Sequence, residues 1–386
     1  MINEKFIADT PESVGIDSAK LAVLLDRCRK EVDDGLLPSA QVCIARNGRI
    51  AAFETFGNQS NNSLYCVFSA TKGITSAAAW LLIQEGKLDI TLKVTELVPE
   101  FSGNGKEAIT VEQLFTHTAG FPHAPFRPTD WWDKEKRYKR FSDWTLNWPP
   151  GSRFEYHPTS SMWVIADIIE RLSGLSYESF VRERIARPLG LPDLWVGCPE
   201  SEHHRIAPVV HVGETLTPED YKEMGLPVPP VTEVTEEALS RFNETAVRKV
   251  PVPGGGGIMS AAELALFYQA LLHGGLANTH LWTPETLSKG RQLHTGDMIN
   301  PLTQAAVSRG LGIVLAGDNE RNLRGFGHTN SPTAFGHNGA GGQLAWVDPE
   351  TGISLGYCTN GFDRNDVRQA RRGVSIGNKA ADCALV

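Results

Sequence analysis

Ser69-Ala70-Thr71-Lys72 is the stretch of this 386-residue sequence that says most about its fold and chemistry. Residues 64–68 form a short apolar run, and residues 73–84 (GITSAAAWLLIQ) are small or apolar without proline, as in a buried helix. Ser69 therefore lies at the N-terminus of a predicted helix. Because positions i and i+3 share a helix face, the Lys72 amine comes beside the Ser69 hydroxyl and can take its proton. Unpaired N–H groups of the first turn would stabilise the negative charge that develops during attack.

Two later segments support this interpretation, since a serine-x-x-lysine pattern alone recurs by chance in chains of this length. Residues 150–156 (PGSRFEY) place Tyr156 after a Pro-Gly turn and before an apolar run that predicts a helix. Residues 335–342 (FGHNGAGG) place His337 and Gly339 in a glycine-rich turn before a predicted strand. The order of the three segments favours a serine nucleophile that is activated by a lysine and a tyrosine.

The motif order resembles that of the serine β-lactamase and penicillin-binding-protein superfamily, whose motifs are S-x-x-K, a Tyr- or Ser-headed triplet, and K-T-G or H-x-G. Residues 114–120 (LFTHTAG), 188–191 (PLGL) and 255–263 (GGGIMSAAE) are similar to other recurring segments of that superfamily. The resemblance covers most of the chain and is strongest to the class C-like branch that holds the family VIII carboxylesterases. It implies that Ser69, Lys72 and Tyr156 are catalytic and that the N–H groups of Ser69 and Ala340 form the oxyanion hole.

Two departures from the superfamily pattern indicate the substrate class. The tyrosine triplet reads Tyr156-His157-Pro158 and lacks the asparagine of class C β-lactamases, whose amide helps to hold an acylamido side chain and the lysine. His337 stands where a β-lactamase usually has lysine, so a group that is mostly neutral at pH 7 replaces a cation that attracts the substrate carboxylate. Both losses favour uncharged esters or amides over penicillins and peptidoglycan peptides.

We therefore predict a serine hydrolase, a carboxylesterase that forms an acyl-enzyme on Ser69 and needs no cofactor. A β-lactamase, an amide hydrolase and an acyltransferase of the same fold are alternatives. A penicillin-binding sensor that acylates without turnover is an alternative of another class.

The order of predicted elements indicates an α+β fold. Asp17 caps a predicted helix, and Asn47-Gly48 is a hairpin signal between two apolar runs. Strand patterns return at residues 311–315, 343–347 and 353–359, before a predicted closing helix at 363–372. Both chain ends thus share one antiparallel sheet flanked by helices, as in the β-lactamase-like fold that the resemblance implies. We predict a discontinuous sheet domain (1–60 and 250–386), an inserted, mainly helical domain (61–249) and, at 198–250, a long surface excursion.

Aromatic residues are concentrated between Phe121 and Trp148, where four of the nine tryptophans fall within 28 residues. Phe126, Trp131 and Trp132 are candidates for an apolar wall that contacts the substrate. The alternative is that these rings pack the irregular segment against the helical domain, since aromatic residues serve both roles.

Charge and composition argue against several other classes. The net charge is −8 and no Lys/Arg cluster stands out, so we expect no nucleic-acid partner. The N-terminus lacks the pattern of a secretory signal and no run of 18 apolar residues occurs, so we expect a cytoplasmic protein without a membrane partner. The six cysteines form no C-x-x-C pair, and adjacent His203 and His204 lack further residues at ligand spacing, so we expect no metal.

Residues 373–377 (GVSIG) match the G-x-S-x-G nucleophile elbow of α/β-hydrolases at Ser375. That fold needs an acid and a histidine after the serine, but residues 378–386 contain no histidine. It also needs a parallel sheet before the elbow, which the strand pattern does not show. We therefore interpret Ser375 as a coincidental match.

Overall fold

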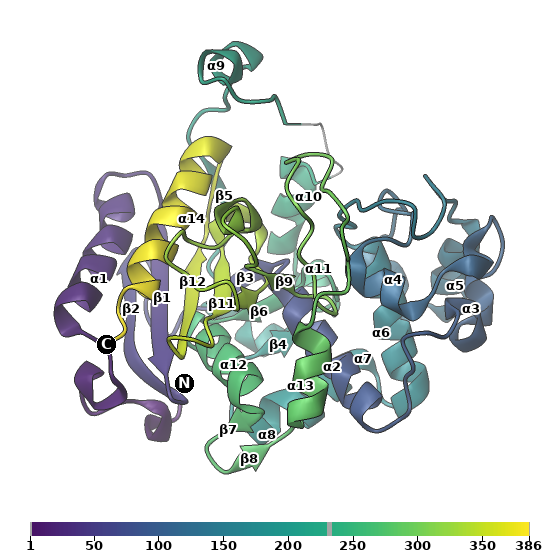
Figure 1. Cartoon of the computed structure of the whole chain (residues 1–386), viewed down its shortest axis with the longest axis horizontal. Helices are drawn as coiled ribbons and strands as arrows, with labels where there is room; N and C mark the ends of the chain where they lie inside the picture. The colour runs from purple at the N-terminus through teal and green to yellow at the C-terminus, as the bar shows by residue number, and fades with distance from the viewer. Residues whose placement is uncertain (1, 230–233, 386) are drawn as a thin grey trace.

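A six-stranded antiparallel sheet joins the two ends of the chain, which confirms the predicted fold class (Figure 1). The computed structural model describes residues 2–229 and 234–385. The strand order is β2-β1-β12-β11-β10-β9. The strands are β1 (Ser39–Arg46), β2 (Arg49–Gly57), β9 (Val314–Leu315), β10 (Phe335–Gly336), β11 (Leu344–Val347) and β12 (Ile353–Thr359).

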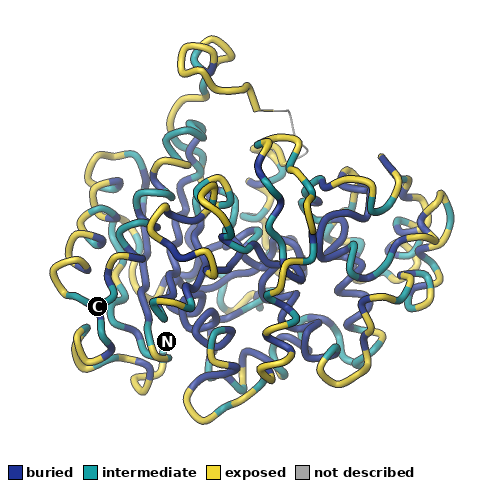
Figure 2. The backbone as a smooth tube through the Cα atoms, viewed as in Figure 1, coloured by how far each residue is buried: buried dark blue, intermediate teal, exposed yellow. Residues whose placement is uncertain are grey.

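Helices cover both faces of this sheet. Alternate residues of a strand point to opposite faces, so Val42 of β1 packs with α1 (Ser18–Asp33) and α14 (Asp366–Ala381), whereas Cys43 packs with α12 (Ala261–His273). The side chain of Asp17 accepts hydrogen bonds from the backbone N–H groups of residues 19 and 20, which caps α1 as predicted. The sheet interior is buried, as Figure 2 shows.

The closing helix α14 starts and ends later than predicted. Ile376 and Ala380 lie on its buried face against the sheet, and this packing carries the helix through the two glycines of the GVSIG match. Ser375 therefore lies inside a helix, where its Oγ accepts a hydrogen bond from Arg27 Nε at 3.1 Å. A nucleophile elbow requires a sharp strand-to-helix turn, so the structure agrees with the interpretation of Ser375 as a coincidental match.

The helices between residues 71 and 189 pack beside the sheet, with α2 at their centre against α6. They are α2 (Thr71–Gln84), α3 (Val94–Leu97), α4 (Val111–Thr116), α5 (Lys134–Asp143), α6 (Ser160–Ser173), α7 (Tyr177–Val181) and α8 (Arg187–Leu189). A small sheet of order β3-β6-β4 leads into α2. Its strands are β3 (Tyr65–Phe68), β4 (Trp195–Val196) and β6 (Gly257–Met259). The division into two domains stays a prediction.

Only part of the predicted surface excursion lies at the surface. Helix α9 (Pro218–Glu223) projects from the body in Figure 1 and is largely exposed in Figure 2. In contrast, α10 (Glu236–Ser240) and α11 (Thr245–Arg248) fold back, and Leu239 and Val247 are buried. These helices are too short to produce a readable apolar period, which is why the sequence suggested a loop. The remaining elements are β5 (Val210–Val212), β7 (Gly275–Leu276), β8 (Thr279–His280), α13 (Pro284–Arg291) and β13 (Gly361–Asp363).

Candidate active site

Ser69 lies in the short connection between β3 and α2, as the sequence predicts. It is partly exposed, whereas Phe68 and Ala70 on either side are buried. Phe68 has a φ of 45°, a left-handed conformation that is unfavourable for a bulky residue. Its ring is held edge-on against Phe242 at 5.4 Å between centroids. This packing keeps the backbone turned so that Ser69 faces a cavity with mainly apolar walls.

The amine of Lys72 is fully buried and is held by three oxygen atoms. Its Nζ lies 3.2 Å from Ser69 Oγ and 2.7 Å from each of the backbone carbonyl oxygens of Pro158 and Gly254. These carbonyls hold the lysine in a chain that lacks the asparagine amide of the second motif. A Cβ at position 254 would lie only 3.1 Å from the Pro158 oxygen, so glycine permits this close approach. Burial lowers the pKa of Lys72 from its usual value, and Tyr156 partly opposes that shift.

Tyr156 approaches the nucleophile from the other side. Its hydroxyl donates a hydrogen bond to Ser69 Oγ at 2.9 Å, and Lys72 Nζ lies 5.0 Å from the centre of its ring. Burial by itself raises the pKa of Tyr156, but the charges of Lys72 and Arg309 contribute to a net pKa below the usual value. The structure thus places the three predicted catalytic side chains in mutual contact; their roles remain predictions.

His337 directs one ring nitrogen to the backbone and the other to Arg309. Its Nδ1 lies 2.9 Å from the carbonyl oxygen of Asn338, which can only accept, so Nδ1 carries the proton. Nε2 therefore has the free lone pair and accepts a hydrogen bond from Arg309 Nη1 at 3.3 Å. Burial, the Arg309 charge and the Lys72 charge hold the pKa of His337 well below its usual value, which keeps the ring neutral.

Arg309 corrects one inference from the sequence. Replacement of the motif lysine by His337 suggested that the site has no fixed cation at this position, but the guanidinium of Arg309 occupies its neighbourhood. Its Cζ also lies 5.5 Å from the centre of the Tyr156 ring. Arg309 stands before β9, about 30 residues ahead of the glycine-rich turn, and nothing in its local sequence marks it as a site residue.

The glycine-rich turn brings the predicted oxyanion-hole residue to the nucleophile. Ala340 begins a single 3₁₀ turn and lines the same cavity as Ser69. A Cβ at Gly339 would lie 2.1 Å from the carbonyl oxygen of Val67, so only glycine lets the turn approach the strand before Ser69 this closely. Gly339 thus supports the site through its backbone, and a direct contact with substrate stays a prediction.

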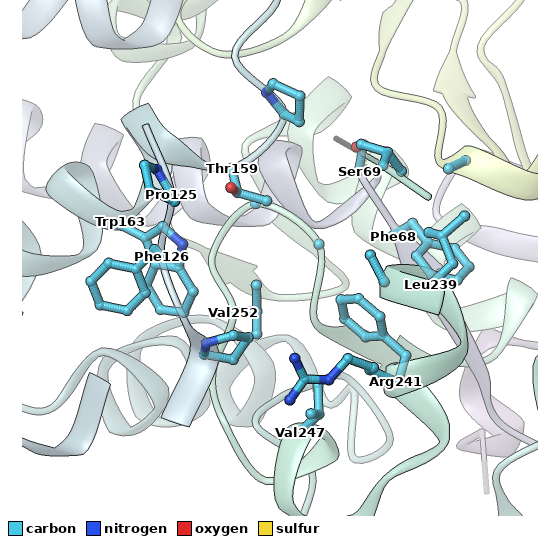
Figure 3. A pocket seen from close by; sticks show the side chains of 18 of the residues that line it. Phe68, Ser69, Pro125, Phe126, Thr159, Trp163, Leu239, Arg241, Val247 and Val252 are labelled. Atoms are coloured by element: carbon cyan, nitrogen blue, oxygen red, sulfur yellow. The ribbon is translucent and has the colours of Figure 1, made fainter. Parts of the chain in front are cut away.

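A cavity of about 290 Å³ opens at Ser69 and is lined mainly by apolar side chains (Figure 3). Phe126 lies in its wall and stacks on Trp163 at 4.3 Å between centroids. Trp131 is fully buried under the guanidinium of Arg137, and Trp132 is 54% exposed. Neither tryptophan lines this cavity, so their proposed contact with substrate has no support from the geometry.

Several cavity residues escaped the sequence analysis. The opposite wall comes from the α10–α11 segment that was predicted to be a surface excursion, and it includes Leu239, Phe242 and Val247.

In the described ranges, no group of His, Cys, Asp and Glu side chains is arranged to hold a metal ion. Within those same ranges, no helix combines the length and apolar character needed to cross a membrane.

The fold and the similarity to known proteins place this chain in the serine hydrolase superfamily of esterases, β-lactamases and carboxypeptidases. The chain belongs to the Beta-lactamase family, whose sequence profile matches residues 25–376. It is 25% identical over 324 residues to the esterase/beta-lactamase LipL of Mycobacterium tuberculosis, covering 78% of this chain and 70% of LipL.

Two solved structures are similar over almost their whole length. A penicillin-binding-protein homolog from Caulobacter crescentus is 26% identical with a TM-score of 0.73, and the match covers 93% of this chain and 97% of that one. A family VIII carboxylesterase is 24% identical with a TM-score of 0.77, covering 95% and 99%, and shares the fold. These findings confirm the superfamily resemblance.

Proposed function

We propose that the protein is a carboxylesterase that hydrolyses esters with an apolar acyl group through an acyl-enzyme on Ser69. The observation that carries this proposal is the apolar cavity beside the Ser69 hydroxyl. Among the described residues of its wall one is charged, Arg241, which pairs with Glu244 at 3.4 Å at the exposed edge. The names of LipL and of the family VIII carboxylesterase support the same activity.

Arg309 removes one of the reasons to expect an uncharged ester as substrate. Loss of the motif cation no longer argues for uncharged substrates, since a guanidinium lies at the site. Two other grounds remain: the missing asparagine amide, which an acylamido substrate would need, and the aliphatic and aromatic character of the cavity wall. The first concerns the acyl half of the substrate, and we assign the cavity to that half as well.

In the proposed reaction, Ser69 Oγ attacks the ester carbonyl while the pair of Lys72 and Tyr156 takes its proton. The N–H groups of Ser69 and Ala340 would stabilise the oxyanion. Collapse of the tetrahedral intermediate expels the alcohol, which receives a proton from the same pair. Water then attacks the acyl-enzyme and releases the acid by the reverse sequence of proton transfers.

A series of p-nitrophenyl esters from acetate to decanoate tests this proposal, with the chromogenic β-lactam nitrocefin as comparison. Each buried methylene is worth about 0.8 kcal/mol, so kcat/KM should rise by up to about fourfold per methylene until the cavity is full. Ser69→Ala serves as the blank for background hydrolysis. Faster turnover of nitrocefin than of the best ester would reverse the assignment, and a single product equivalent per chain would indicate a sensor.

A further inference from the structure

We propose that Arg309 is a positioning residue for acyl transfer. Its guanidinium is held by neutral His337 and favours the deprotonated form of the Tyr156 hydroxyl, which accepts the Ser69 proton. The proposal rests on the esterase function above, and it names the base that the motif leaves open. It starts from the distribution of charge around the nucleophile.

The site contains two basic groups without an acidic partner. Neither Lys72 nor Arg309 forms an ion pair with a carboxylate in the described part of the chain. Both lie close to the centre of the Tyr156 ring, Lys72 Nζ at 5.0 Å and Arg309 Cζ at 5.5 Å. The Tyr156 hydroxyl is therefore the group of the site that can carry a compensating negative charge.

The hydrogen bonds of Lys72 are compatible with two distributions of protons over Ser69, Lys72 and Tyr156. Two carbonyl oxygens at 2.7 Å each require an N–H donor, and the third position of Nζ faces Ser69 Oγ at 3.2 Å. In one arrangement a neutral amine accepts the Ser69 proton and Tyr156 is a phenol. In the other, a charged ammonium donates to Ser69, and the Ser69 hydroxyl donates to the Tyr156 phenolate.

Arg309 distinguishes these two arrangements because it faces the ring of Tyr156. The fixed positive charge of Arg309 stabilises the phenolate. The same charge acts against the Lys72 ammonium, and the two carbonyl oxygens at 2.7 Å from Lys72 Nζ oppose that effect. His337 fixes the guanidinium, since its Nε2 accepts from Arg309 Nη1 while its Nδ1–H is bound to a backbone carbonyl. The arrangement with ammonium and phenolate is thus the favoured one.

The other groups around Tyr156 do not compete with this effect. His117, after α4, packs on the ring at 4.7 Å, and His337, after β10, lies at 6.1 Å between centroids. Burial and, secondarily, the Arg309 charge hold the pKa of both histidines well below its usual value. Both are therefore neutral, and the charges that face Tyr156 from α2 and from the segment before β9 are those of Lys72 and Arg309.

In this arrangement, acylation moves one proton from Ser69 to Tyr156 and then to the leaving alcohol. The Ser69 Oγ–H bond breaks and its proton moves to the phenolate oxygen of Tyr156, while Oγ forms a bond to the carbonyl carbon. The carbonyl π electrons move onto oxygen and return when the ester C–O bond breaks. The Tyr156 hydroxyl then gives its proton to the departing alkoxide and is a phenolate again. Lys72 and Arg309 keep their protons throughout.

Removal of the Arg309 charge tests the proposal through the pH dependence of kcat/KM on a p-nitrophenyl ester. With the cation about 5.5 Å from the ring and an effective dielectric near 20, Arg309→Met should shift the acidic limb of the pH profile of kcat/KM to higher pH by up to about two units. Arg309→Lys keeps the charge and should lie closer to the wild type. Arg291→Met is the matched control, because Arg291 also stacks on an aromatic ring, Phe335 at 5.2 Å, and should leave the limb unchanged.

A second measurement needs no turnover. Carbon-13 at tyrosine Cζ reports phenolate directly by NMR, and the Tyr156→Phe variant assigns the signal. Burial raises the pKa of Tyr65, Tyr177, Tyr268 and Tyr357, so these residues remain phenols at neutral pH. We expect a Tyr156 phenolate signal near pH 7 in the wild type and its loss at the same pH in Arg309→Met.

The outcomes separate this inference from the esterase proposal. Two results would overturn the role of Arg309 and leave the esterase proposal intact. One is an acidic limb of the pH profile that does not move in Arg309→Met. The other is a wild-type Tyr156 that remains a phenol at a pH where the enzyme is active. A wild type without ester hydrolysis would remove the esterase proposal, and the NMR titration would still decide the state of Tyr156. If Arg309→Met does not fold, the wild type and Arg309→Lys carry the NMR test.

Discussion

Replacing His337 by lysine, the residue usual at this position in β-lactamases, should destabilise the protein. His337 is 5% exposed, and its Nε2 lies 3.3 Å from Arg309 Nη1. An ammonium placed about 4 Å from that guanidinium, at an effective dielectric near 20, is repelled by about 4 kcal/mol. Rotation of the longer side chain relieves part of this repulsion, so we expect the free energy of unfolding at pH 7 to fall by about 2–3 kcal/mol.

Urea denaturation measures this loss, with His337→Gln as the control because glutamine keeps a neutral acceptor for Arg309. The repulsion depresses the pKa of the introduced ammonium in the folded state below its unfolded value of about 10.4. The destabilisation is therefore full at pH below the folded pKa and disappears as pH rises through the unfolded pKa. The stability difference between His337→Lys and His337→Gln should accordingly shrink between pH 7 and pH 10.5.

The double variant His337→Lys/Arg309→Met gives the sharpest test, since it transfers the cation from one position to the other. The loss of unfolding free energy in the double variant should be about 2 kcal/mol smaller than the sum of the losses in the two single variants, because the repulsion is absent. If lysine at position 337 costs no more than glutamine, and if the cost is the same with and without Arg309, then the guanidinium does not face this position and the charge argument fails.

Three further predictions concern the nucleophile, its base and the acyl cavity. Ser69→Ala should lower kcat/KM on a p-nitrophenyl ester by several orders of magnitude, about 10⁶ in well-studied serine hydrolases, whereas Ser375→Ala should retain most activity. Lys72→Ala and Tyr156→Phe should each lower kcat by at least about 10²-fold, and their combination should add little; multiplicative losses would show that they act independently. Leu239→Trp should fill the cavity and flatten the rise of kcat/KM with acyl length, leaving acetate hydrolysis nearly unchanged; an undiminished rise would place the acyl chain elsewhere.

The sequence predicted the sheet well wherever a local signal was strong. The Asn47-Gly48 turn forms the expected hairpin, and both residues take the left-handed conformation that this turn requires. The strand predicted at 311–315 shrinks to two residues because Gly312 has a φ of 77°, and a Cβ there would lie 1.9 Å from Ser76 Oγ. Close packing on α2 thus decides this segment, and such a contact between distant residues leaves no periodic trace in a sequence.

The site was predictable to the extent that its chemistry depends on side chains in ordered motifs. Ser69, Lys72 and Tyr156 come together as their motifs suggest. The oxygen atoms that hold Lys72 are backbone carbonyls of Pro158 and Gly254, so residue identity does not reveal them. The apolar wall of the cavity from α10 and α11 was missed for a related reason, since its residues are adjacent only after the segment folds back.

Arg309 shows why a motif departure should be judged in the folded site. Comparison of position 337 alone suggested that the site had lost a positive charge. A residue from another part of the chain, Arg309, supplies a positive charge close to the same position. A lysine at position 337 and an arginine at 309 would repel each other, so neutral His337 and charged Arg309 form a compatible pair. The histidine in the third motif is thus a neutral acceptor for the partly buried guanidinium beside Tyr156.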